Sequence, residues 1–462
     1  MARSPQHPLL VSVLALCTVL LTGCATVVIG RPGVVEPPVR DTAGGEVTVE
    51  GATGEPVDVL ARNALADLET YWTGQLPDTF GQQFQPLQGG YFSVDPGNVD
   101  PADYPQGVGC GSQPLEVENN AFYCQAPNAA NSDSITYDRA FLAELADQFG
   151  RFIPALVMAH EFGHAVQARV GLPESSIATE TQADCLAGAW TRWVAEGEAE
   201  HSNLRAPELD ELLRGYFQLR DPVGTSSAAE SAHGSYFDRA SAFQEGFDDG
   251  PAACRDRFGP ERVFTQGRFT SDVDFERQGN APYGDLIGYV ADALPTFWDR
   301  AFSEVFDERF DAPAVEAFRG TAPDCAPDDR DLVYCANGDV VGYDEQDLTR
   351  EAYRIGDFAV ATAISIPYAL AARDQLGLDP ADPDALRSAV CLTGWFSAQV
   401  YNQQIPDLLI SPGDLDESVL FLLEYGVQPD VLGAADLSGF QLVDLFRNGF
   451  VEGVTACDVG VR

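Results

Sequence analysis

The sequence predicts a mainly helical fold of the α+β class, in which one domain is followed by a second copy of itself. Two observations lead to this prediction. Apolar residues recur three and four positions apart in several long segments, as they do on one face of a helix. Blocks of residues also recur in the same order about 206 positions later, which is typical of a duplication. With 462 residues, the chain is long enough for two or three domains with cores of their own.

The first 23 residues predict a signal peptide. Arg3 precedes an apolar stretch from Leu9 to Leu21, which is short for a membrane span. The residues from Leu21 to Cys24 look like a bacterial lipobox, in which Cys24 becomes the lipidated first residue of the mature chain. A plain signal peptide that is cut nearby is the alternative. We therefore expect an extracytoplasmic lipoprotein that Cys24 anchors to the bacterial cell membrane.

Residues 24–57 are rich in glycine, proline, valine and threonine and show no helical periodicity. We expect them to form a flexible tether between the membrane and the folded part. The pattern of a folded domain follows, and we place its boundaries at residues 58–256, with the repeat at 257–462.

The charge of the chain excludes some partners. The formal net charge is −44, and every basic residue is an arginine. Nucleic acids and anionic lipid surfaces are therefore not expected as electrostatic partners. The acidic run Asp328-Asp329-Arg330-Asp331 lacks the regular spacing of calcium ligands, so we expect it to carry solvated charge.

A pair of histidines marks the candidate site. The segment from Leu142 to Val170 predicts a helix that ends at Gly171, and it contains His160, Glu161 and His164 in an HExxH motif. Residues four apart lie on one face of a helix, so both imidazoles can bind one metal ion. Glu161 can then act on a water molecule without being a ligand. The alternative is a helix with two ordinary histidines.

A catalytic zinc site needs a third protein ligand. A histidine ten residues after His160 is excluded, because Val170 stands there. Glu180 and Asp184 form a Glu-x-x-x-Asp pattern on a second predicted helix, residues 179–200. Glu180 can bind the metal while Asp184 holds a ligand histidine by a hydrogen bond. The alternatives are an ordinary first-turn acid for Glu180 and a buried cap or salt bridge for Asp184.

The second half repeats the first at offsets that fall along the chain from 226 to 203. Shorter loops in the second copy account for this fall. The recurring pairs are Trp72 and Trp298, Phe80 and Phe306, Phe84 and Phe310, Tyr137 and Tyr343, Gly171 and Gly377, Cys185 and Cys391, Gly246 and Gly449, and Cys254 and Cys457.

Eight cysteines follow the leader, four in each copy. An even number in an exported protein indicates disulfides. Four cysteines allow three pairings within each copy. We predict one short and one long bridge in the first copy and the equivalent two bridges in the second. The predicted bridges are Cys110–Cys124, Cys185–Cys254, Cys325–Cys335 and Cys391–Cys457.

The second copy lacks the candidate site. At an offset of 206, aliphatic residues and a proline replace every polar member, so this copy is predicted to be catalytically degenerate. The replacements are Ile366 for His160, Pro367 for Glu161, Leu370 for His164, Leu386 for Glu180 and Val390 for Asp184.

The segments HEFGH, ETQADCLAGAW and AHGSYFDRASAFQEGFDDGPAAC together resemble the bacterial neutral zinc metallopeptidases, relatives of the gluzincins. The resemblance covers about Ala61 to Cys254. It implies a zincin-like fold with one zinc ion on His160, His164 and Glu180. Residues 255–462 depart from the single-domain pattern of the family, so nothing about them carries over.

These features predict a membrane-anchored zinc metallopeptidase, with an endopeptidase favoured. Zinc would activate a water molecule, Glu161 would serve as general base, and His233 would donate to the developing oxyanion, with Tyr236 as second choice. A polypeptide or a peptide bridge of the cell wall fits as substrate. The alternative is a non-enzymatic scaffold or binding lipoprotein with a structural or vestigial zinc site, which would have no use for Glu161.

Overall fold

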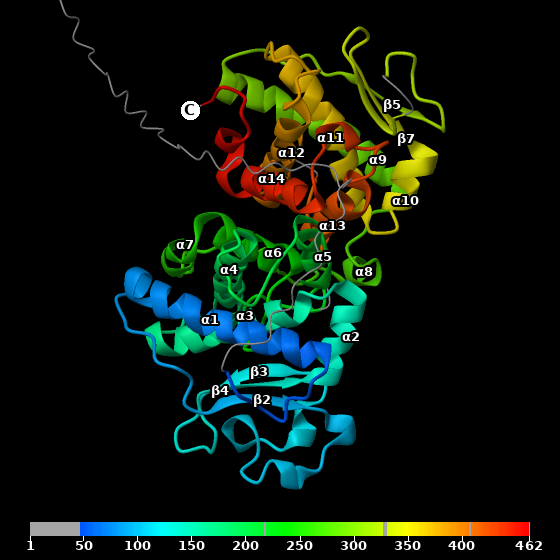
Figure 1. Cartoon of the computed structure of the whole chain (residues 1–462). Coiled ribbons are helices and arrows are strands. Elements are labelled where there is room, and N and C mark those ends of the chain that lie inside the picture. Colours follow the sequence, from blue (N-terminus) through cyan, green and yellow to red (C-terminus); the bar gives the residue numbers. More distant parts are fainter. Residues whose placement is uncertain (1–46, 217–218, 327–329, 406–407, 462) are drawn as a thin grey trace, which may run out of the picture. The chain divides into compact units, whose positions relative to one another are not determined.

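The computed structural model describes residues 47–216, 219–326, 330–405 and 408–461 (Figure 1). Most of this part of the chain is helical, with two small sheets, as an α+β fold requires. The strands are β1 (Val49–Glu50), β2 (Gly90–Val94), β3 (Ala121–Cys124), β4 (Ser134–Asp138), β5 (Ala314–Phe318), β6 (Leu332–Cys335) and β7 (Val340–Asp344). The helices are α1 (Pro56–Phe80), α2 (Arg139–Phe149), α3 (Ile153–Val170), α4 (Ser176–Ala195), α5 (Ala206–Tyr216), α6 (Tyr236–Asp249), α7 (Pro251–Asp256), α8 (Asp272–Glu276), α9 (Tyr283–Ala301), α10 (Arg350–Ala352), α11 (Asp357–Gln375), α12 (Ala385–Tyr401), α13 (Asp414–Phe421) and α14 (Gly439–Glu452).

The two sheets have matching topology. The first has the order β1-β2-β4-β3, with β2 parallel and β3 antiparallel to β4. The second has the order β5-β7-β6, with β5 parallel and β6 antiparallel to β7. The register repeats as well, because Tyr137 pairs with Ala121 as Tyr343 pairs with Leu332. The predicted duplication is compatible with this arrangement.

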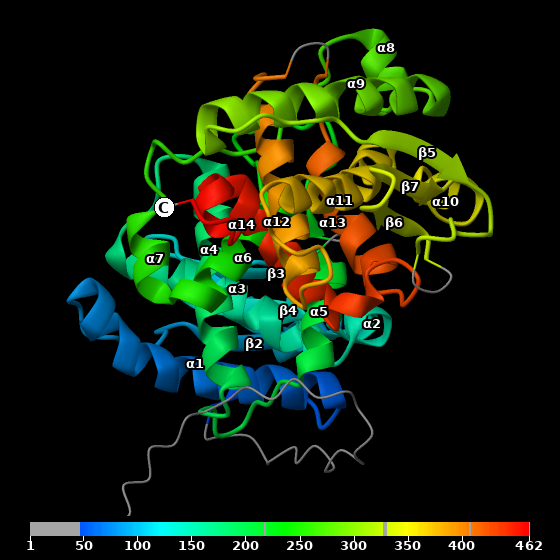
Figure 2. The same ribbon diagram turned by 90° about the horizontal axis from the view of Figure 1, so that it is seen from above.

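Two glycines in each half bring a pair of helices into close contact. A Cβ on Gly188 of α4 would lie 2.0 Å from the carbonyl oxygen of Phe243 on α6, and a Cβ on Gly394 of α12 would lie 1.9 Å from that of Phe446 on α14. Gly246 and Gly449 approach the facing helices as closely. Only glycine allows such an approach of two backbones. Figures 1 and 2 show α4 beside α6, and α12 beside α14.

The structure joins the same four cysteine pairs that the repeat predicts. The short bridges, Cys110–Cys124 and Cys325–Cys335, lie beside the two sheets. The long bridges, Cys185–Cys254 and Cys391–Cys457, tie α4 to α7 and α12 to the end of the chain.

The helix predicted from Leu142 to Val170 is two helices, α2 and α3. Gly150 lies between them with a φ of +102°, which favours glycine. Pro154 lies in the first turn of α3, where its missing N–H is not needed. The prediction missed this break because the apolar spacing continues across it.

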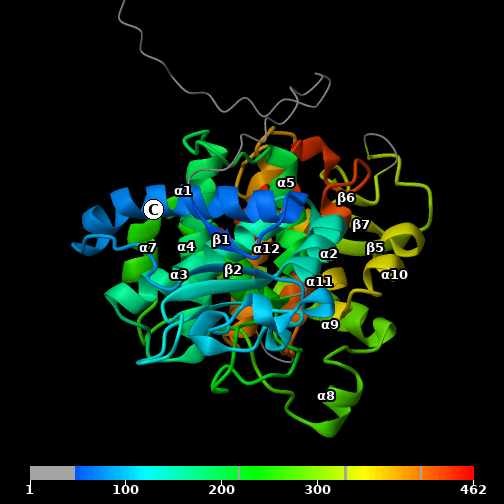
Figure 3. The ribbon, with the colours of Figure 1, turned by 60° about the horizontal axis from the view of Figure 1, so that its bottom comes forward.

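Part of the predicted tether belongs to the fold. Val49 and Glu50 of β1 pair with β2, and α1 begins at Pro56 (Figure 3). Cys24 and the predicted signal peptide lie outside the described residues. Within the described ranges, no helix is long and apolar enough to cross a membrane.

The two halves exchange equivalent contacts. Asp210 of α5 accepts hydrogen bonds from the backbone N–H groups of Gly439 and Phe440 at the start of α14. Asp416 of α13 accepts one from Phe237 at the start of α6. Because Asp210 and Asp416 are repeat counterparts, each half caps a helix of the other half with the same acid. The interface therefore has an approximate twofold character.

Candidate metal centre

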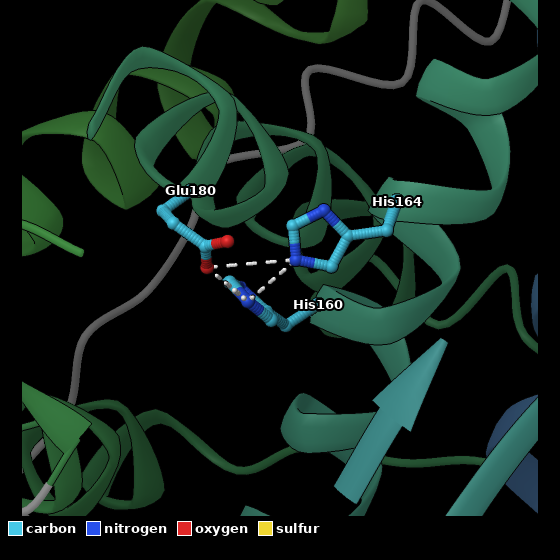
Figure 4. A group of neighbouring side chains, drawn as sticks. All are labelled: His160, His164 and Glu180. Carbon is cyan, nitrogen blue, oxygen red and sulfur yellow. Dashed lines mark hydrogen bonds and ion pairs between the residues drawn. The ribbon is translucent and has the colours of Figure 1, made fainter. Parts of the chain in front are cut away.

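Two neighbouring helices bring three candidate metal ligands together. His160 and His164 lie four residues apart on α3, and Glu180 lies in the second turn of α4, which packs against α3. The imidazole Nε2 atoms are 3.2 Å apart. Glu180 Oε2 is 3.3 Å from His160 Nε2 and 3.5 Å from His164 Nε2 (Figure 4).

These separations fit a zinc ion. Zinc binds histidine nitrogen and carboxylate oxygen at about 2.0–2.2 Å, so tetrahedral ligands lie about 3.3–3.5 Å apart. The lone pairs of the two imidazoles also face each other and an anionic carboxylate, which calls for a cation between them. A donor set of two imidazoles and a carboxylate suits zinc.

Buried partners orient both imidazoles. His160 Nδ1 lies 2.8 Å from Asp184 Oδ1, and His164 Nδ1 lies 2.9 Å from Gln167 Oε1. Each partner oxygen accepts a hydrogen bond from Nδ1–H, and this tautomer leaves the lone pair of Nε2 free to bind a metal. Asp184 therefore lies where it can orient His160, a candidate metal ligand.

Asp184 is itself held by an arginine from a third helix. Arg239 of α6 donates to both carboxylate oxygens of Asp184, from Nε and Nη2, each at 2.7 Å. Both side chains are buried. The bidentate pair fixes the orientation of the carboxylate, and through it that of His160.

The ionisable side chains of the centre shift one another's pKa values. Burial lowers the pKa of His160, but the charge and hydrogen bond of Asp184, together with Glu180 and Glu161, outweigh it and raise this pKa to about 10. Burial acts to raise the pKa of Asp184, yet Arg239 and His160 hold it below its usual value.

Glu161 lies beside the three donors without being one of them. Its Oε2 accepts a hydrogen bond of 2.7 Å from the backbone N–H of Tyr123 on β3. Burial raises the pKa of the Glu161 carboxyl, against the effect of the two histidines. The side chain is fixed at the wall of the cavity, within reach of a bound molecule.

The centre opens into a cavity of about 620 Å³. The N-terminal part of β3, the α3–α4 face and the loop before α6 line it. His233 lies in that loop, half exposed, and its Nδ1 is 3.1 Å from Asp221 Oδ1. Tyr236 is not among the lining residues: it is fully buried, and its hydroxyl donates to the Leu213 carbonyl.

The second half retains a smaller cavity at the equivalent place. Its volume is about 280 Å³, and Ile366, Pro367, Leu370 and Leu386 are among its lining residues. These are the counterparts of the two histidines, Glu161 and Glu180. The cavity is thus conserved in position while its metal donors are gone.

Three contributors to the site were not predicted from the sequence. Gln167 is three residues after His164, a spacing that places it on the same helix face and offers a usable signal. Arg239 comes from a helix distant in sequence, and the Tyr123 contact is made by a backbone group. Neither Arg239 nor the backbone contact of Tyr123 could be predicted from the spacing of residues in the sequence.

The chain is similar to bacterial proteins over part of its length. An uncharacterized protein of Mycobacterium tuberculosis (strain H37Rv) is 28% identical over 179 residues, which cover 33% of this chain and 59% of the relative. The uncharacterized protein YpfJ of Escherichia coli (strain K12) is 29% identical over 203 residues, which cover 38% of this chain and 66% of the relative. The chain thus spans about three fifths to two thirds of the length of these curated relatives. No solved structure matches it.

The family model described as "Putative neutral zinc metallopeptidase" matches residues 6–258, more than half of the chain. The matched range contains the three donors, Glu161 and the partners that orient the imidazoles. It ends near Cys254, so residues 259–462 lie beyond it. The chain therefore belongs to this family of zinc metallopeptidases.

Proposed function

We propose that the protein is an extracytoplasmic peptidase that binds one zinc ion on His160, His164 and Glu180 and hydrolyses peptide bonds. One observation carries the proposal. Three protein donors face a large cavity, and a separate buried carboxylate, Glu161, lies beside them. A structural zinc site closes with a fourth protein ligand instead.

The residues of the chain divide the chemistry between them. When bound, zinc polarises the scissile carbonyl and lowers the pKa of a water molecule toward neutrality. Glu161 takes a proton from the attacking water and returns it to the leaving amine. His233, which Asp221 orients, donates a hydrogen bond to the developing oxyanion.

The edge of the first sheet supports a peptide as the substrate. Strand β3 pairs with β4 on one side and is the last strand of the sheet. Residues Asn119 to Tyr123 line the cavity beside the metal donors. An extended peptide can add to such an edge through backbone hydrogen bonds, which places a peptide bond near the metal. This mode favours cleavage within a chain.

The proposed location rests on the sequence of the leader. Cys24 would carry the lipid, and the residues before β1 would connect it to the fold. Metabolic labelling with a fatty acid tests this, because a Cys24→Ser variant should lose the label.

The enzymatic proposal is tested by zinc analysis and peptide-library cleavage of the wild type, Glu161→Gln and the exposed control Glu198→Gln. We expect about one zinc per chain in all three, and a loss of kcat/KM of about 10²–10⁴-fold for Glu161→Gln alone. His233→Gln should lower kcat and retain zinc. Stoichiometric zinc without cleavage by the wild type would favour a scaffold with a structural ion.

A further inference from the structure

The second half contains a cluster of three buried carboxylates. Asp357 begins α11, and Asp414 and Glu417 lie in the first turns of α13, which packs beside α11 (Figures 1 and 2). One oxygen atom of each carboxylate lies within 4.8 Å of one of each other carboxylate. Their exposed fractions are only 8%, 3% and 8%.

Two buried oxygen atoms in this cluster have no hydrogen-bond partner among the residues that the structure describes. Asp357 Oδ1 and Asp414 Oδ1 are buried and unpaired. One oxygen of each acid accepts a hydrogen bond: Ala281 N–H donates to Asp357 Oδ2, Ser411 N–H to Asp414 Oδ2 and Phe358 N–H to Glu417 Oε2. Since a buried anionic oxygen without a partner is unfavourable, the cluster requires protons or a cation.

At the equivalent place in the first half, two arginine side chains supply positive charge. Glu208 and Glu211 are the repeat counterparts of Asp414 and Glu417. Arg151 stands at the position of Asp357, and its Nε is 2.8 Å from Glu208 Oε1. Arg205 stands at the position of Ser411, and its Nη2 is 2.9 Å from the same oxygen. Two arginines and two glutamates make this set formally neutral.

Backbone contacts show that the two places are structurally equivalent. Arg205 N–H donates to Glu208 as Ser411 N–H donates to Asp414, at 2.7 and 2.8 Å. The Glu211 carboxylate lies where a Cβ on Gly150 would be, and the Glu417 carboxylate lies where a Cβ on Gly356 would be.

The second set therefore has three acids and a serine, formally −3, where the first has no net charge. No ion pair joins Asp357, Asp414 or Glu417 to an arginine or a histidine anywhere in the described ranges. The positive charge that Arg151 and Arg205 supply in the first half is missing.

We propose that Asp357, Asp414 and Glu417 bind a calcium ion, which takes the place of the two arginines. All three donors are carboxylate oxygens, which select a hard cation over zinc. Oxygen ligands lie 2.3–2.6 Å from calcium, so a separation of up to 4.8 Å is within reach of one ion. Magnesium demands near-ideal octahedral geometry and gives up its water ligands reluctantly, whereas calcium accepts irregular sets of oxygen ligands.

The site would stabilise the second half and its junction with the first. Asp357 holds the start of α11 to the segment before α9 through Ala281, and Asp414 and Glu417 belong to α13. Asp416 lies two residues after Asp414 on α13, and its carboxylate accepts a hydrogen bond from the backbone N–H of Phe237 at the start of α6 in the first half. A bound ion would therefore stabilise the folded state by an amount that grows with the logarithm of its free concentration.

The test is thermal unfolding of the full mature chain, stripped of divalent ions and reloaded with one equivalent of zinc, during titration with calcium chloride. We expect the unfolding temperature to rise on the order of 5 °C at saturation. Calorimetry should give one calcium ion per chain, with weaker binding of magnesium.

Matched variants locate the ion. Asp357→Asn should weaken calcium binding at least tenfold. Asp357→Arg combined with Ser411→Arg copies the charges of the first half, and this variant should unfold at a high temperature that calcium does not change. His160→Ala should lose zinc and retain the calcium response. The proposal is overturned if calcium leaves the wild type unchanged, which would mean that protons compensate the cluster, or if Asp357→Asn responds like the wild type.

Discussion

At the scale of single residues, the centre depends on a chain of contacts from Arg239 through Asp184 to His160. Each contact is 2.7–2.8 Å long and buried. The metal donors therefore have fixed orientations before any ion binds, which reduces the entropy lost on binding.

Asp184→Asn tests this chain. The amide retains an acceptor for His160 but loses the charge, and Arg239 is left buried without its carboxylate. We expect zinc affinity to fall about 10–100-fold, measured by competition with a chromophoric chelator. Asp147→Asn, an exposed acid on α2, should bind zinc like the wild type. Equal affinities of both variants would show that Asp184 serves only the packing of α4 and α6.

The candidate metal ligands could be predicted from the sequence, but the arginine that orients them through Asp184 could not. His160 and His164 follow from the four-residue spacing on one helix, and Glu180 from a second helix. Arg239 reaches Asp184 from 55 residues away, and only the packing of α6 on α4 brings them together. Spacing rules do not describe such contacts.

At the scale of elements, the contact between α4 and α6 positions Glu180 and Asp184 against α3. The same contact recurs as α12 against α14, in the half that lacks the candidate zinc donors. The chain thus provides an internal control for the effect of helix packing on the site.

The variants Gly188→Ala and Gly394→Ala compare the two helix contacts. In each variant the new Cβ overlaps a facing carbonyl oxygen, so we expect each to lower the free energy of unfolding by about 1–3 kcal/mol. Only Gly188→Ala should also weaken zinc binding, because α4 carries Glu180. Chemical denaturation and zinc titration measure the two effects. A loss of zinc affinity in Gly394→Ala as large as that in Gly188→Ala would contradict this division.

Element boundaries show where sequence patterns stop being informative. Apolar spacing runs from α2 into α3, so it hides the break at Gly150. The two residues of β1 fall in a stretch with the composition of a linker, and only pairing with β2 makes them a strand. In both cases tertiary contacts decide the structure.

At the scale of the whole molecule, the chain forms two related halves with separate roles. One holds the candidate zinc donors, and the other has a smaller cavity at the equivalent place and a cluster of acids at its junction with the first. The repeat was visible in the sequence, but the reciprocal caps of Asp210 and Asp416 were not, because nothing in the sequence indicates which surfaces meet.

A pair of acids across the junction predicts a pH dependence. Burial and the nearby charge of Asp444 on α14 raise the pKa of Asp248 on α6 to about 7. Between about pH 4 and 7 the folded chain retains this proton and the unfolded chain loses it, so stability decreases as the pH rises through this window. Asp248→Asn should flatten that decrease, measured as the difference in denaturation midpoint between pH 5 and pH 8. Asp292→Asn, which changes an exposed acid on α9, should follow the wild type, and an unchanged slope in Asp248→Asn would rule out this assignment.

The proposed activity depends most on the three metal donors. Anomalous X-ray scattering at the zinc edge, from crystals of the zinc-loaded chain, locates the bound ion most directly. We expect one strong peak, about 2.0–2.2 Å from His160 Nε2, His164 Nε2 and a Glu180 carboxylate oxygen, with Glu161 outside bonding distance. A zinc peak elsewhere, or Glu161 as a fourth protein ligand that closes the site, would contradict the account.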